Sequence, residues 1–411
     1  MKVRFFLTRI AILATGHLAK EAYALDMEEV WRAGEGEHVK DNKPLVDAAH
    51  AGMRHERRLG EPDMSLSAQN QSGPVVRSEN GKLVVDESTR YYLNDLVQQT
   101  VGASNEQKTN IAFVKTHKTA STTMAAILYR YALRHESKLA WFSGHGSAIP
   151  LEEAARRTEE SGVRVDIMHY HVSIFGSLSE SWERAVKHYA NIMRDPNDIN
   201  YVTIFREPRS HLLSYYYYFM EPSTQKSIEE FLMEPGARSK MALDRLSNPL
   251  SAEFGVRDAR GLETMIQKFL PQFKMVILVE HFDEGLMILR RMLGWDLLDM
   301  TYLSLLKTKS GSKRYDGKKL HDVPAFSDLR PEVQNRIDEL TELDQKLYSA
   351  AVEQYTKIYE DISREVEDDL VRFQDLQALV TGYLRFNASS SAYYMYRHVD
   401  PYSQKLKAQL F

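Results

Sequence analysis

The sequence predicts an α/β protein in which helices flank a central parallel sheet. From residue 108 onward, short runs rich in β-branched and aromatic residues alternate with runs that have helical periodicity. This alternation is typical of parallel strands joined by crossover helices. Two of the strand-like runs end directly at basic residues, and ligands of α/β proteins bind at the carboxyl ends of strands. The expected strands are 111–115, 165–170, 201–205 and 274–279, and the expected helices are 120–135, 179–193, 208–220, 227–233, 261–269 and 283–293.

The composition is that of a large globular domain with flanking pieces. The chain has 411 residues, of which 43% are hydrophobic and 27% are charged. Its formal net charge of −4 provides no global basic field, so a nucleic-acid partner is not expected. The chain contains no cysteine, which excludes disulfides, thiol catalysis and cysteine-bound zinc. Because it also lacks an H-E-x-x-H sequence or a carboxylate cluster with metal-ligand spacing, no metal is expected.

Two segments precede the alternating region. Residues 1–24 combine a basic start with a short apolar run and a small-x-small sequence at Ala22-Tyr-Ala24, as in a secretory signal peptide. Arg9 interrupts the apolar run, which is too short to span a membrane. A secretory signal is therefore favoured over a cytosolic helix, and a short N-terminal anchor with membrane association stays open. Residues 25–107 are polar, which predicts a stem with one helix at Leu93–Val101.

The first expected strand leads into a loop that suits an anion. The loop carries Lys115, His117 and Lys118, and a helical pattern begins directly after it. Backbone N–H groups and the helix dipole at such a junction attract phosphate or sulfate esters. The loop has none of the glycines of the Walker pattern G-x-x-x-x-G-K-[ST], so it is not the usual nucleotide loop. A plain strand-to-helix turn, in which Ser and Thr only cap the helix, is the alternative. The small residues expected to surround the anion are Thr119, Ala120, Ser121, Thr122 and Thr123.

A second strand-to-helix junction repeats this arrangement. The expected strand 201–205 ends at Arg206, and Pro208 suits the first turn of a helix. Ser214 follows Arg206 after about two helical turns. A guanidinium makes charge-assisted bonds to phosphate, and a hydroxyl can complete the shell. The tyrosines at 215–218 are expected to serve packing rather than base stacking.

Together the two junctions resemble those of sulfotransferases. The run Phe113-Val-Lys-Thr-His-Lys-Thr-Ala-Ser-Thr-Thr123 resembles the galactose-3-O-sulfotransferase family in particular. Weaker similarity continues over residues 108–362, at Asp166–Ser173, Asn248–Gly255 and Met275–Leu289. Members of that family usually contain cysteines, which this chain lacks, and its middle segments differ enough to leave the acceptor open.

The resemblance implies an enzyme that transfers a sulfuryl group from 3′-phosphoadenosine 5′-phosphosulfate (PAPS) to a carbohydrate hydroxyl. The implied acceptor is the 3-OH of a galactose on a glycolipid or glycan, as for galactosylceramide sulfotransferase, in the Golgi lumen or membrane. A sulfotransferase domain of P-loop-like fold would span 108–380, with a C-terminal tail at 381–411. Lys118 would stabilise charge on the bridging oxygen, while Arg206 and Ser214 would bind the 3′-phosphate. The donor-binding residues that the resemblance implies are Lys115, Lys118, Thr119, Ala120, Ser121, Thr122, Thr123, Arg206 and Ser214.

Transfer to a hydroxyl also needs a general base, and histidine has a suitable pKa. His171 is the first candidate and His169 the second; on a strand they would share one face, because side chains i and i+2 point the same way. His117, beside the donor loop, is placed to contact the sulfuryl group, and Glu280 is a weaker candidate for the base. A purely structural role explains any single one of these histidines equally well.

Two alternative functions, and the role of one basic segment, stay open. A P-loop-type small-molecule kinase would share the sheet and the anion loop, although the Walker glycines and an Mg²⁺-binding aspartate after a strand are missing. A non-catalytic glycan-binding relative would not need Lys118, Arg206 and Ser214, which are all present. The basic segment Lys307–Lys319 would either close over the donor phosphates or remain a solvated charge run. Long helices are expected over 327–380.

Overall fold

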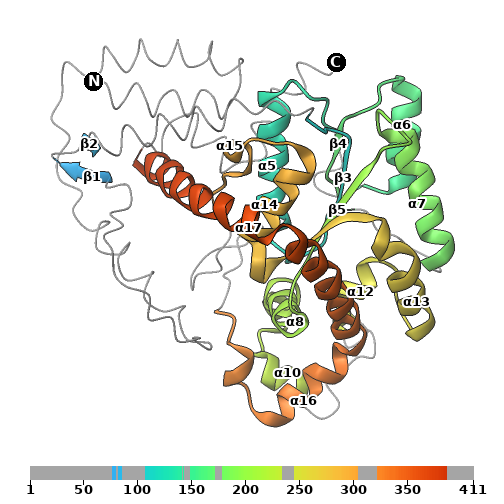
Figure 1. Ribbon diagram of the computed structural model, residues 1–411. Helices are drawn as coiled ribbons and strands as arrows, with labels where there is room; N and C mark the ends of the chain where they lie inside the picture. The colour runs from blue at the N-terminus through green and yellow to red at the C-terminus, as the bar shows by residue number, and fades with distance from the viewer. Residues whose placement is uncertain are drawn as a thin grey trace.

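A four-stranded parallel sheet forms the centre of the protein (Figure 1). The computed structural model describes residues 76–79, 82–85, 107–140, 142, 149–171, 178–233, 245–303 and 322–386. The order in the sheet is β4-β3-β5-β6, and all three pairings are parallel. This confirms the predicted α/β fold with helices around a parallel sheet. The strands are β3 (Ile111–Val114), β4 (Ile167–Met168), β5 (Asn200–Phe205) and β6 (Phe273–Leu278).

The strands are buried along almost their whole length because the sheet is covered on both faces. Every residue of β3 and β5 is buried. The edge strand β4 has two residues, fewer than the predicted 165–170. Its flanking residues pair elsewhere: Val165 bridges to Met193, and the Asp166 N–H bonds to the carbonyl of Lys138 at 2.7 Å.

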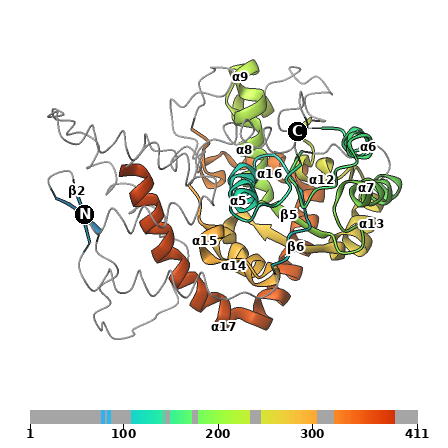
Figure 2. The same ribbon diagram turned by 90° about the horizontal axis from the view of Figure 1, so that it is seen from above.

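Helices lie on both faces of the sheet (Figures 1 and 2). On one face, α15 (Leu297–Met300) packs against both α5 (Ser121–Arg134) and α14 (Phe282–Leu293). On the other, α7 (Leu178–Ile192) packs against α6 (Leu151–Ser161) and α13 (Ala259–Thr264), which continues into the π-helix η2 (Met265–Phe269) and the 3₁₀ turn η3 (Leu270–Gln272). The connections from β3 to β4 and from β4 to β5 run in opposite directions along the sheet, so right-handed crossovers put α5 and α7 on opposite faces. α6 and α15 are not among the helices expected from the sequence.

A second apolar core forms beyond the sheet. Its helices are α8 (Pro208–Tyr215), the π-helix η1 (Tyr216–Met220), α9 (Glu221–Thr224), α10 (Ile228–Met233), the 3₁₀ turn η5 (Phe326–Asp328) and α16 (Pro331–Leu340). Leu212, Tyr216 and Phe231 pack there against Val333 and Ile337. The single helix expected at 208–220 is thus an α-helix that changes into a π-helix at Tyr216.

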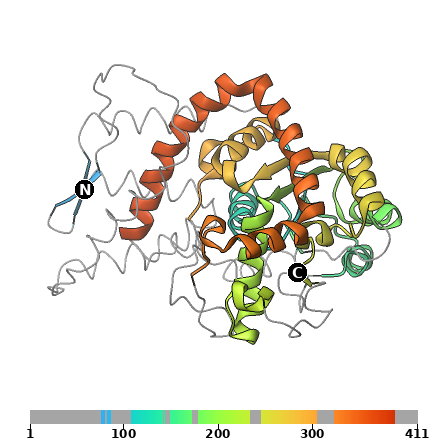
Figure 3. The same ribbon diagram turned by 90° about the horizontal axis from the view of Figure 1, so that it is seen from below.

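The C-terminal helix α17 (Glu342–Phe386) packs along the outside of the domain. Its backbone is non-helical at Ile362 (φ −133°, ψ 21°), so it consists of two helices joined at a bend, which Figure 3 shows. The first part packs against β6, α8 and α12 (Pro249–Glu253), and the second is tied to α14, where Asp369 accepts bonds of 2.6 Å from Arg290 and Arg291. The long helices expected at 327–380 are therefore confirmed.

Several expected segments lie outside the described residues. They are 1–24, Leu93–Val101, Lys307–Lys319 and the tail after Phe386. In the expected polar stem the structure shows an antiparallel pair, β1 (Val76–Glu79) with β2 (Lys82–Val85). Asn80-Gly81, which separates them in the sequence, is a dipeptide favoured in two-residue hairpin loops. Within the described ranges, no helix combines the length and the apolar character needed to cross a membrane.

Two side chains, the half-buried Asn248 and the fully buried Asp344, hold α12 to α17. Asn248 adopts a left-handed conformation (φ 49°) before α12, and its Oδ1 accepts from the N–H groups of Leu343 (2.7 Å) and Asp344 (3.2 Å). Asp344 in turn accepts from the N–H groups of Leu250 (3.0 Å) and Ser251 (2.7 Å). Each side chain therefore satisfies the free N–H groups at the start of the other helix.

Replacing Asp344 with alanine should lower the free energy of unfolding by about 1–3 kcal/mol, because two buried N–H groups lose their acceptor. Chemical denaturation measures this change. The control is Glu342→Ala, at an exposed position of the same helix start, which should change the free energy of unfolding far less. Equal losses of unfolding free energy in the two variants would show that the bonds of Asp344 do not stabilise the contact between α12 and α17.

Candidate functional site

The candidate site lies at the carboxyl ends of the four strands. β3 leads into loop 115–120, β5 is followed at once by Arg206, and β6 is followed by Glu280. His171 comes three residues after β4. Because parallel strands end at the same edge of a sheet, segments far apart in the sequence meet here.

The loop after β3 is held by its own hydroxyl groups. Thr116 Oγ1 donates to the carbonyl of Ile204 on β5 (2.8 Å) and lies 2.7 Å from Thr119 Oγ1. Ser121 Oγ donates to the carbonyl of Thr116 (2.6 Å). The loop contains no glycine, yet Lys118 (φ 60°) and Ala120 (φ 56°) adopt left-handed conformations, which cost energy for residues with a Cβ atom. The hydroxyls of Thr119 and Ser121 therefore shape the loop.

The backbone of the same loop offers free donors. Within the described part of the chain, the N–H groups of residues 118–122 have no acceptor, whereas those of Thr123 and Met124 bond to the carbonyl of Ala120 (2.9 and 3.2 Å). These free N–H groups precede or begin α5, at the positive end of its dipole. Such an arrangement suits an anion.

Among the described residues, three cations in or beside this loop form no ion pair with a carboxylate. None of the ion pairs recorded for the described residues includes Lys115, Lys118 or Arg206. Burial lowers the pKa of Lys115 to about 8; burial, with a smaller effect of Arg206, also lowers that of Lys118 to about 8. Arg206, whose own pKa is lowered by burial, donates to the carbonyl of Lys118 at 3.3 Å. The site is thus a desolvated positive region that an anion would stabilise.

The π-helix η1 brings two aromatic rings to this region. The ammonium of Lys118 lies 3.7 Å from the ring centre of Tyr218, and the ring of Phe219 meets that of His117 edge-on. Tyr216 and Tyr217 are buried in the second core, as expected for packing residues. Single π-helical turns inside helices often mark functional sites. Ser214, the other residue expected at the donor, is buried on the last turn of α8.

The imidazole of His117, a loop residue, stacks on that of His171. His171 and His117 have ring centroids 3.9 Å apart and an interplanar angle of 12°. His171 Nδ1 lies 3.0 Å from the carbonyl of Lys115, which can only accept, so Nδ1 carries the proton and Nε2 has a free lone pair. Burial is the main reason that the pKa of His171 is lowered to about 2, and Lys115 contributes. His171 is therefore neutral at physiological pH.

His169 has a different environment from its neighbour. Its ring packs against those of Tyr129 (4.6 Å) and Tyr170 (5.1 Å), and neither ring nitrogen has a hydrogen-bond partner among the described residues. Burial lowers its pKa to about 3. Glu280 is also engaged, since it accepts from the N–H of Glu207 (2.9 Å) and from the hydroxyl of Tyr348 (2.8 Å).

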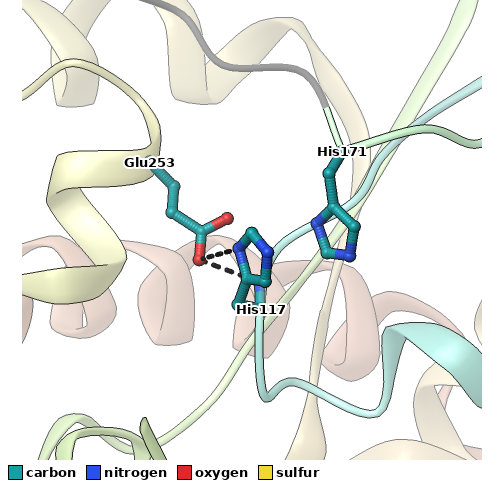
Figure 4. Close-up of side chains that lie close together, drawn as sticks. All are labelled: His117, His171 and Glu253. Atoms are coloured by element: carbon teal, nitrogen blue, oxygen red, sulfur yellow. Dashed lines mark hydrogen bonds and ion pairs between the residues drawn. The ribbon is translucent and has the colours of Figure 1, made fainter. Parts of the chain in front are cut away.

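Glu253 belongs to the site, although the sequence analysis did not select it. Its Oε1 accepts from the backbone N–H of His117 at 2.8 Å and lies 3.2 Å from His117 Nδ1 (Figure 4). The only sequence signal was its place within Asn248–Gly255, a segment noted for family similarity. No motif distinguishes this glutamate from the other acidic residues.

The same three side chains lie close enough together to suggest a metal site. Ligand atoms of His117, His171 and Glu253 are within 4.8 Å of one another. A metal lies near the ring plane of each ligating imidazole at about 2.1 Å from its nitrogen. Two nearly parallel rings 3.9 Å apart do not meet this requirement unless one ring rotates. We therefore assign no metal to the cluster.

Comparison with known proteins identifies relatives of this chain. A family model described as galactose-3-O-sulfotransferase matches residues 88–366. Galactose-3-O-sulfotransferase 2 of Mus musculus is 27% identical over 292 residues, which cover 66% of this chain and 69% of the relative. Galactose-3-O-sulfotransferase 3 of Homo sapiens is 31% identical over 222 residues, or 49% of each chain. Galactosylceramide sulfotransferase of Homo sapiens is 27% identical over 219 residues, again 49% of each chain. The matches thus span between about half and about two thirds of these relatives.

Anion binding at this loop should weaken as the pH rises above about 8. The sign follows from the lowered pKa values of Lys115 and Lys118: the cationic form that attracts an anion is present below pH 8 and is lost above it. Titration calorimetry with adenosine 3′,5′-bisphosphate should show about a tenfold loss of affinity between pH 7 and pH 9. Constant affinity up to pH 9.5 would mean that neither lysine contributes its charge.

Proposed function

The chain belongs to the galactose-3-O-sulfotransferase family, and on this premise we propose that it transfers the sulfuryl group of PAPS to a carbohydrate hydroxyl. The acceptor in this proposal is the 3-OH of a galactose residue on a glycolipid or glycan, and the reaction takes place in the Golgi lumen. The observation that carries the proposal is the group of three desolvated cations beside free backbone N–H groups. PAPS carries phosphate and sulfate groups that would replace the missing carboxylate partners.

In the proposed complex, each of the two strand-to-helix junctions binds a different part of the donor. The N–H groups of residues 118–122 and the ammonium groups of Lys115 and Lys118 hold the 5′-phosphosulfate. Arg206 and Ser214 bind the 3′-phosphate. Lys118 would leave the ring of Tyr218 for the phosphosulfate, exchanging a cation–π contact for a charge-assisted one.

Sulfuryl transfer requires positioning and charge neutralisation more than covalent chemistry from the protein, by analogy with phosphoryl transfer. The acceptor oxygen attacks sulfur in line, a new S–O bond forms, and the bond from sulfur to the bridging oxygen breaks. The electron pair of that bond stays on the 5′-phosphate, where Lys118 neutralises it. The acceptor proton passes to a histidine of the stacked pair His171 and His117. His169, enclosed by two tyrosines, would have to leave its packing first.

Adenosine 3′,5′-bisphosphate should raise the thermal midpoint of the protein more than ATP does. A ligand at about 100 times its Kd stabilises the native state by about 2.7 kcal/mol. A thermal-shift titration with both nucleotides measures this. A larger shift with ATP and Mg²⁺ would favour the kinase alternative, and no shift with either nucleotide in a folded protein would refute the donor site.

Arg206→Ala and Lys118→Ala should impair the enzyme in different ways. Arg206 faces the remote 3′-phosphate, so its loss should weaken donor binding by about 1.5–3 kcal/mol with little change in kcat. Lys118 meets charge that grows in the transition state, so its loss should lower mainly kcat. Steady-state kinetics with varied PAPS separates the two effects. Defects confined to KM in both variants would disprove this division of roles.

A further inference from the structure

We propose that Glu253 is a positioning residue of the catalytic centre and acts through His117. It holds the His117 ring in the tautomer whose Nε2 is free, and it stabilises the imidazolium that forms when this nitrogen takes the acceptor proton. The inference rests on the proposed sulfuryl transfer and adds to it the identity of the proton acceptor and of the group that supports it.

The contacts of Glu253 favour a proton on Nδ1 of His117. Its Oε1 accepts from the backbone N–H at 2.8 Å and lies 3.2 Å from Nδ1 of the same residue. A carboxylate oxygen at this distance favours a proton over a lone pair on Nδ1, which leaves the lone pair on Nε2. No hydrogen bond of that Nε2 is recorded among the described residues, and the side chain of His117 is 40% exposed. A bound hydroxyl can therefore reach Nε2.

The surroundings of the ring fix its orientation. His171 stacks on it at 3.9 Å, and Phe219 meets it edge-on at 5.4 Å. The carbonyl of His117 accepts from His211 Nε2 at 2.8 Å. Glu253 ends α12, whose start is tied to α17 by the reciprocal bonds of Asn248 and Asp344. The carboxylate is thus placed by two helices rather than by a mobile side chain alone.

The charged groups around each ring favour His117 over His171 as the proton acceptor. Protonation of either ring creates a cation in a region that already contains Lys115 and Lys118. Among the described residues, Glu253 comes within ion-pair distance of His117, at 3.2 Å from Nδ1, whereas His171 forms no ion pair with a carboxylate. His171 has a backbone carbonyl at Nδ1 and the ammonium of Lys115 nearby. In this account His171 stays neutral and supports the His117 ring through stacking, while the proton moves from the acceptor oxygen to His117 Nε2.

The decisive variant is Glu253→Gln, which keeps an oxygen to accept from the backbone N–H of His117 but removes the charge. We expect kcat to fall about 10- to 100-fold, while the affinity for adenosine 3′,5′-bisphosphate stays within about twofold. His117→Ala should lower kcat by about 10²–10⁴-fold. Adding Glu253→Gln to His117→Ala should cause no further loss, because the glutamate acts through this ring. Glu263→Gln on α13, which likewise neutralises a helical glutamate but lies outside the site, should leave kcat unchanged.

Several results would overturn the inference. One is a Glu253→Gln enzyme with turnover within twofold of the wild type. Another is an independent, multiplicative loss when the two substitutions are combined. A third is a large loss of turnover in His171→Ala together with near-normal turnover in His117→Ala.

A measurement without substrate keeps this inference separate from the proposed function. In ¹⁵N-histidine-labelled protein, the His117 resonances, assigned by their absence in His117→Ala, should show a protonated Nδ1 in the wild type. This preference should be lost in Glu253→Ala. The same tautomer in both proteins would overturn the inference even if sulfuryl transfer occurs. Failure of the wild type to bind adenosine 3′,5′-bisphosphate would refute the proposed function instead.

Discussion

The site depends on holding cations away from water without giving them carboxylate partners. Lys115, Lys118 and Arg206 are desolvated at the carboxyl edge of the sheet, and burial lowers the pKa of each. An unpaired buried cation is unfavourable, so the surrounding fold must keep it there. The loop after β3 does so by bonding its hydroxyls inward and accepting left-handed backbone at Lys118 and Ala120. Such local strain is typical of binding sites, where a ligand supplies the missing interaction.

The parts of the fold that were predicted from sequence are those with a short-range signal. The buried strands at Ile111–Val114 and Asn200–Phe205 are rich in β-branched and aromatic residues, and α14 has clear helical periodicity. In two segments a strand is followed by a basic residue and then by a helix. This order also predicted which residues gather at the carboxyl edge, since parallel topology brings strand ends together. Arg206 donates to the carbonyl of Lys118, so the two expected donor segments do meet.

The remaining features depend on contacts between residues far apart in the sequence. Glu253 meets His117 only because α12 is capped by Asp344 and α17 by Asn248, and no local pattern encodes that exchange. The change from α- to π-helix at Tyr216 has no signal in the tyrosine run itself, and it coincides with residues that pack in the second core. The histidines were grouped by the spacing of a strand, but β4 ends before them, and the environments of His169 and His171 diverge. Sequence reasoning thus located the site but not its carboxylate.

The central claim is that this site moves a sulfuryl group from PAPS to a galactose hydroxyl. Incubation of the purified protein with ³⁵S-labelled PAPS and a panel of galactosides, other glycans and glycolipids tests it most directly. The account predicts label in a β-galactoside or galactolipid, with the sulfate on the 3-OH by linkage analysis, and no label with Lys118→Ala at matched protein concentration. Label on no member of the panel, from a protein that binds adenosine 3′,5′-bisphosphate, would contradict the claim and favour a non-catalytic glycan-binding role.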